Sequence, residues 1–268
     1  ASANLRCHLE RVTANALRRD SRQAVRKLCE SDGQGGLRFC HQPPLIWRFE
    51  ALPAEWLAGL DHKAWNDAVS ELYVASLSPA MRQLLACFRL ADVALKAVGV
   101  GSVGIRCGVT LLLGDHPDDV LVIQGKQAEP SVLAPHLPEL QAPAHQGERV
   151  VQGQRLMQTA SDPFLGWATN PMGQNLYFRH FRDWKASVDV AQLDADGLKD
   201  YAKLCGWSLA KAHARSGDRR AIAAHIGEPK RFARAVHEQA LVHADLTEQD
   251  HASLLRGIAT GSISSCEI

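Results

Sequence analysis

Three closely spaced glycines and a later lysine are the residues in this sequence best suited to holding a phosphate group. Gly99, Gly101 and Gly104 form the pattern G-x-G-x-x-G, and Lys126 follows an apolar run, Val122-Ile-Gln-Gly. Glycine lets backbone N–H groups approach phosphate oxygens closely, and lysine supplies a positive charge. A β-hairpin with a glycine-rich turn and an incidental surface lysine explains the same residues, and the residues alone leave both interpretations open.

The segments around the glycines decide which kind of phosphate loop they resemble. Residues 92–98 and 105–113 have the β-branched composition of strands, and 120–124 predicts a third. A dinucleotide-binding loop requires a helix directly after the third glycine, whereas Gly104 is followed by a strand pattern. Strand, glycine loop, strand and then a lysine on the next strand is the order found in protein kinases.

A kinase lysine is oriented by a glutamate on the helix that follows it. The spacing predicts such a helix over 145–160, after a proline-rich connection. Three polar side chains on it are candidates for orienting Lys126, and the sequence does not choose among them: Glu148, Gln152 and Gln154.

The remaining segments predict helices on both sides of a strand-rich centre. Apolar residues recur at helical spacing over 4–30, over 64–90 and from Asp194 onward. Strand patterns recur over 164–168 and 175–182. Because strands and helices are segregated along the chain, the expected class is α+β with an antiparallel sheet.

Two segments could supply acidic residues for catalysis, and both have structural explanations. His243 to Asp250 contains H-x-D-L, but it lies within an uninterrupted helical pattern and fits a solvated helix face. His213, Arg215 and Asp218 end another apolar stripe, where positive side chains complement a helix C-terminus. They remain secondary candidate site residues.

The composition of the chain argues against nucleic-acid, membrane and cysteine-bound metal partners. The 268 residues carry 30 basic and 29 acidic side chains, so no overall charge attracts nucleic acid. The longest apolar run is much shorter than the roughly 20 residues that span a bilayer, so no membrane partner is expected. The seven cysteines include no C-x-x-C pair, which predicts reduced thiols, a cytoplasmic location and no metal site formed by cysteines.

Five segments resemble the bacterial domain-of-unknown-function 2252 family over nearly the whole chain. They are Val98–Cys107, Arg149–Gln158, Ser161–Trp167, Tyr177–Lys185 and Leu209–Asp218. The chain departs from the family pattern at Gln127, where the family usually has glutamate, and at Trp184, where it usually has methionine.

The resemblance implies a protein-kinase-like fold related to aminoglycoside phosphotransferases, with ATP and Mg²⁺ as cofactors. It implies a small antiparallel-sheet lobe with one helix over 91–186, flanked by helical segments 1–90 and 187–268 of a second, helical lobe. The family's catalytic loops precede the region seen here in a permuted order, so we expect them upstream of this chain. The implied nucleotide-binding residues are Gly99, Gly101, Ser102, Gly104, Lys126, Phe181 and Asp183.

The residues and the resemblance together leave three possible functions. The first is the ATP-binding part of a phosphotransferase that acts on an unknown small molecule or protein. The second is a non-catalytic interaction module that keeps the kinase fold. The third, a nicotinamide-dependent oxidoreductase, requires a helix immediately after Gly104, so a strand there excludes it.

Overall fold

A computed structural model of the chain describes residues 3–17, 21–57, 59–97, 104–137, 143–181 and 187–264. It forms two compact units, Ala1–Ala212 and His213–Ile268. The class is α+β, as the sequence predicts, and the strands of the first unit pair antiparallel. Within the described residues, no helix is long and apolar enough to cross a membrane.

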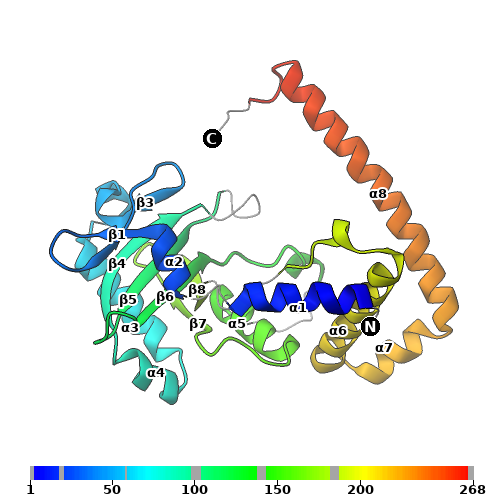
Figure 1. Ribbon diagram of the computed structural model, residues 1–268, viewed down its shortest axis with the longest axis horizontal. Coiled ribbons are helices and arrows are strands. Elements are labelled where there is room, and N and C mark those ends of the chain that lie inside the picture. The colour runs from blue at the N-terminus through cyan, green and yellow to red at the C-terminus, as the bar shows by residue number, and fades with distance from the viewer. Residues whose placement is uncertain are drawn as a thin grey trace. The chain divides into compact units, whose positions relative to one another are not determined.

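A six-stranded sheet forms the centre of the first unit (Figure 1). Its strand order is β3-β4-β5-β6-β8-β7, and every neighbouring pair is antiparallel. The five predicted strands are confirmed with ends displaced by a few residues, and the short edge strand β3 was not predicted. The strands are β3 (Ile46–Arg48), β4 (Arg89–Lys96), β5 (Cys107–Leu113), β6 (Val120–Gln127), β7 (Gly166–Thr169) and β8 (Asn175–His180).

The register of the sheet sorts its side chains onto two faces. Cys107 on β5 and Tyr177 on β8 lie directly opposite Lys126 on β6, so these three side chains share what we call the lysine face. Gly108 and Phe178 are both paired with Gly125, one residue away, and belong to the opposite face.

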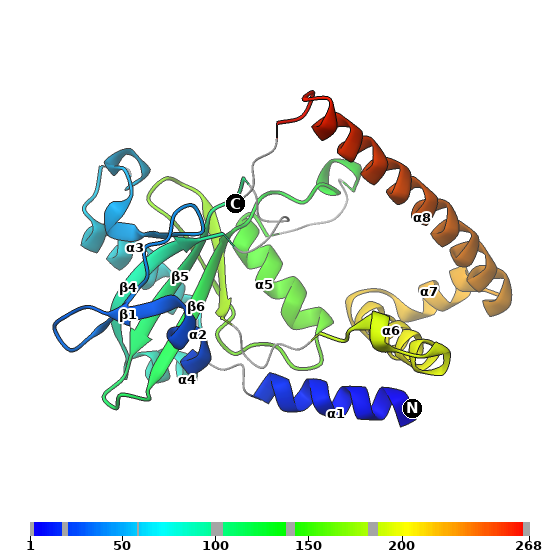
Figure 2. The same ribbon diagram turned by 45° about the horizontal axis from the view of Figure 1, so that its top comes forward.

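The lysine face carries one apolar core at the end of β6 distant from Lys126. Helix α2 (Ser21–Leu28) and strand β2 (Leu37–Phe39) cover it, and α2 lies over β6 in both views (Figures 1 and 2). The buried members are Ala24, Leu28, Phe39, Ile46, Ala94, Val109, Leu111, Leu113, Val122 and Phe181.

The opposite face carries a second core beneath α3 (His62–Ala75) and α4 (Pro79–Leu85). Tyr73 of α3 is anchored there, because its hydroxyl donates a 2.9 Å hydrogen bond to the carbonyl of Phe164. Ser78 opens α4 by accepting from the backbone N–H of Met81. The buried members are Val69, Tyr73, Leu77, Leu85, Leu121, Ile123, Phe164, Ala168, Leu176 and Phe178.

Helix α5 (Gln146–Met157) confirms the helix predicted between the third and fourth central strands. His145 caps it by accepting from the N–H of Glu148 through Nδ1, and its Nε2 lies 3.1 Å from Oγ1 of Thr169. The N–H of Gln146 donates to Oδ1 of Asn175 at 2.8 Å. Because Thr169 and Asn175 belong to the lysine face, α5 is held on that face, beside β7 and β8.

The remaining helices agree with the predicted helical flanks. In α1, the buried imidazole of His8 accepts from the backbone N–H of Asp189 at 3.2 Å, which ties the start of the chain to the segment before α6. The helices are α1 (Ala3–Leu17), α6 (Ala195–Ser216), α7 (Arg219–Ile226) and α8 (Pro229–Ala259).

A short hairpin was not predicted from the sequence. Strand β1 (Cys29–Ser31) pairs with β2 across the glycine-rich segment 32–36, and it overlaps the end of the helical spacing found over 4–30. Each strand has three residues, too few to produce an alternating pattern. Within the turn, Oδ1 of Asp32 accepts from the N–H groups of Gln34 and Gly36, which lowers the pKa of that carboxyl.

Asp92 joins this hairpin to the sheet. Its carboxylate accepts from the N–H of Phe39 on β2 at 2.7 Å and from the N–H of Val93 at 2.8 Å. The side chain is 8% exposed, and the guanidinium of Arg48 approaches it at 3.9 Å. Burial raises the pKa of Asp92, although both backbone hydrogen bonds favour the carboxylate.

Replacing Asp92 by alanine should therefore destabilise the first unit. Two N–H groups would lose their acceptor, and we expect the free energy of unfolding to fall by about 1–3 kcal/mol. Urea denaturation followed by circular dichroism measures this change. Asp67→Ala is the matched control, because Asp67 is exposed and forms a surface ion pair with Lys63, so its removal should cost less than about 1 kcal/mol. Equal losses in the two variants would contradict the role given to Asp92.

Candidate functional site

Three positive side chains surround Cys107 at one end of the lysine face. Lys126 and Arg179 come from β6 and β8, and Lys96 ends β4. All three act electrostatically on the Cys107 thiol, which places them around it. Each is half-buried, so their charges are only partly screened by water.

The centre of this cluster consists of neutral polar groups. The Gln124 side chain is 3% exposed; its Oε1 accepts from Nε and Nη2 of Arg179 at 3.1 and 3.0 Å. Its Nε2 lies 3.4 Å from Sγ of Cys107. Burial raises the pKa of Cys107 despite the three cations, so the thiol stays neutral near pH 7. Burial likewise raises the pKa of Tyr177, with Arg179 opposing it.

Neither Lys126 nor Arg179 forms an ion pair with any carboxylate in the part of the chain that the structure describes. Two cations that share one surface attract an anion when no described carboxylate balances their charge. The cluster of Lys96, Lys126 and Arg179 is called the cationic cluster below.

The glycine segment connects two members of this site. β4 ends at Lys96 and β5 begins at Cys107, so both strand ends that flank residues 97–106, which we call the glycine segment, lie at the cationic cluster. Gly104 has a φ of +84°, a left-handed conformation that glycine adopts without strain. Gly99, Gly101 and Ser102 lie outside the described residues. The strand that follows Gly104 excludes the dinucleotide-binding alternative.

The three candidates for orienting Lys126 lie on α5, on the same face of the sheet. The Glu148 carboxylate accepts a 2.8 Å hydrogen bond from Nε2 of Gln152. The structure shows no hydrogen bond or ion pair from Lys126 to Glu148, Gln152 or Gln154. A neighbour with a defined contact to Lys126 is its cross-strand partner Cys107.

Phe181 follows β8 and lies 7% exposed in the core beneath α2. Its N–H donates to the carbonyl of Val122 at 2.8 Å. Phe181 is one of the implied nucleotide-binding residues. Because the sheet uses its N–H, a contact from Phe181 to a nucleotide would have to come from another group of this residue. Asp183 lies outside the described residues.

The secondary candidates belong to the second unit and have the structural roles that the sequence suggested. His213 and Arg215 lie in the last turn of α6. Asp218 caps α7 by accepting from the N–H groups of Arg220 and Ala221 at 2.8 and 3.2 Å. His243 and Asp250 both lie on exposed turns of α8.

Sequence reasoning missed Lys96, Arg179 and Gln124. Each alternates with apolar or aromatic neighbours in a strand, but only the pairing of β4, β5, β6 and β8 shows that they share a face. Among the described residues, no group of three or more His, Cys, Asp or Glu side chains could hold a metal ion.

The loop conformation at Gly104 can be tested by substitution. Gly104→Ala forces a side chain into the left-handed region, and we expect the free energy of unfolding to fall by about 1–2 kcal/mol. Gly153→Ala is the control, because Gly153 lies in α5 with open space around it, and alanine there should raise the same quantity by up to about 1 kcal/mol. A stabilising Gly104→Ala, measured by urea denaturation, would refute the left-handed conformation.

Comparison with known proteins agrees with the resemblance found in the sequence. No curated protein and no solved structure matches this chain. Residues 1–257 match the family described as "Uncharacterized protein conserved in bacteria (DUF2252)". Because this match covers nearly the whole chain, the protein belongs to that family.

Proposed function

We propose that this chain binds the phosphates of ATP at the cationic cluster and is the nucleotide-binding part of a kinase-like phosphotransferase. The observation that carries the proposal is that β4 ends at Lys96 and β5 begins at Cys107, so the two strands that flank the glycine segment have their adjoining ends beside Lys126 and Arg179. Lysine and arginine bind phosphate oxygens through charge-assisted hydrogen bonds, and a glycine segment admits the phosphates closely.

The order of elements supports the same proposal. The glycine segment joins the first two strands of β4-β5-β6, the lysine lies on the third, and α5 follows and lies on the lysine face. In protein kinases the glycine loop, the lysine strand and the helix that carries the orienting glutamate have these relations. The kinase-like fold, the permuted order and the catalytic loops upstream are parts of this proposal.

The roles of the residues follow from their positions. Lys126 would contact the phosphates directly, and Arg179 would add charge while Gln124 holds its guanidinium in place. Lys96 stands where the glycine segment begins. Mg²⁺ would arrive with the nucleotide, and we assign no step to it because the described residues offer no cluster of metal ligands.

Calorimetric titration of the chain with ATP, with and without Mg²⁺, tests the proposal. Lys126→Ala should weaken binding about 10- to 100-fold, the equivalent of one charge-assisted hydrogen bond of about 1.5–3 kcal/mol. Lys63→Ala is the matched control, because Lys63 is exposed on α3, where it pairs with Asp67, and it should leave the affinity unchanged.

Two results would overturn the proposal. One is the absence of any binding at millimolar ATP in a folded protein. The other is an equal affinity for Lys126→Ala and the unaltered chain. The first result would favour the non-catalytic interaction module.

A further inference from the structure

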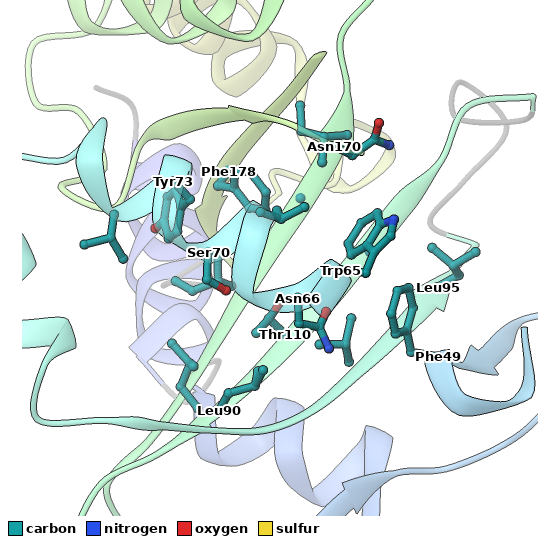
Figure 3. Close-up of a pocket in the computed structure, with 18 of the residues that line it drawn as sticks. Phe49, Trp65, Asn66, Ser70, Tyr73, Leu90, Leu95, Thr110, Asn170 and Phe178 are labelled. Atoms are coloured by element: carbon teal, nitrogen blue, oxygen red, sulfur yellow. The ribbon is translucent and has the colours of Figure 1, made fainter. Parts of the chain in front are cut away.

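A cavity of about 250 Å³ lies on the opposite face of the sheet, between α3 and strands β4, β5 and β6 (Figure 3). Its lining is mostly apolar and includes Leu85, Phe88, Leu90 and Leu112. It is larger than an apolar cavity of about 150 Å³ that stays dry and binds benzene. A space of this size and lining suits a small apolar molecule better than water.

The cavity is open because position 108 is a glycine, which has no side chain to fill it. Gly108 and Gly125 are cross-strand partners on β5 and β6. A Cβ on Gly125 would lie 2.6 Å from the Phe178 ring, so that position is already filled. A Cβ on Gly108 would meet only the carbonyl oxygen of Ala94, at 3.7 Å. A larger residue at position 108 would therefore extend into the cavity.

Trp65 lines the cavity at the end away from Leu90. Nε1 of Trp65 is buried and has no hydrogen-bond partner, although burying an unpaired donor costs free energy. The Phe49 ring lies 4.9 Å from the Trp65 ring and fixes its orientation. Figure 3 shows Trp65 beside Leu95 and Phe49, away from Leu90.

Positive charge lies at this same end. Arg106 also lines the cavity and lies two residues before Gly108, the cross-strand partner of Leu95. Because Leu95 and Trp65 pack in the same apolar cluster, Arg106 lies near the Trp65 end. Its Nη1 lies 2.7 Å from the sulfur of Met172. Arg106 is the one charged residue among the described residues that line the cavity.

We infer that this cavity binds a small amphiphilic carboxylic acid, with its hydrocarbon part at the Leu90 end and its carboxylate toward Trp65 and Arg106. The carboxylate would accept the unpaired N–H of Trp65 and lie in the field of Arg106. The site is separate from the cationic cluster, because Gly108 and Lys126 belong to opposite faces of the sheet.

Octanoate is the probe, and the indole N–H signals of the ¹⁵N-labelled full chain are the readout. Loss of one signal in Trp65→Phe assigns Trp65. We expect that signal to shift and saturate as octanoate is added, with Trp65→Phe binding about 5- to 10-fold more weakly by calorimetry. Octanol, which has the same chain without the charge, should bind more weakly than octanoate, and Arg106→Met should remove that difference.

Filling the cavity is the decisive variant. Gly108→Leu should abolish octanoate binding while the melting temperature stays the same or rises. Gly153→Leu makes the same change in open space on α5 and should bind octanoate like the unaltered chain. If Gly108→Leu does not fold, the Trp65→Phe and Arg106→Met measurements decide.

Three results would overturn the inference: an unmoved Trp65 signal at millimolar octanoate, normal octanoate binding by a folded Gly108→Leu, or octanol binding as tightly as octanoate.

Discussion

The antiparallel pairing of β5 with β6 is the constraint on which both candidate sites depend. Side chains alternate between the two faces of a strand, so a single register assigns every residue of the pair to one face or the other. Cys107 opposite Lys126 forms the lysine face, and Gly108 opposite Gly125 forms the floor of the cavity. A shift by one residue would exchange the two sets and leave Lys126 in the apolar core under α3.

The two faces of the sheet differ in how far other elements cover them. α2 and β2 cover only the far part of the lysine face, where Val109, Leu111 and Val122 are buried, and the basic end is left half-exposed. Charged groups tolerate this position because water still reaches them, whereas complete burial without partners would be costly. On the opposite face, α3 and α4 cover an apolar surface, and the glycine at position 108 leaves space that no neighbour fills.

Polar side chains that are buried or half-buried hold these layers together. Asp92 ties the hairpin to β4, and the contacts of His145 with Thr169 and of Gln146 with Asn175 tie α5 to the last two strands. Gln124 has the same function within the site, because it satisfies the Arg179 guanidinium at a position that is 3% exposed. None of these contacts follows a sequence motif, since each joins residues far apart in the chain.

The sequence by itself determined the order of the five central strands, of α5 and of the helices on either side. Alternating β-branched residues and helical spacing are local properties, so β4, β5, β6, α5 and the helical flanks could be predicted, as could the strand after Gly104. Only the tertiary structure decided which residues accompany Lys126, because Lys96 and Arg179 reach it through strand pairing that leaves no local pattern. The same holds for the three-residue hairpin strands and for the cavity beneath α3: both arise from contacts between distant segments, which spacing along the chain does not encode.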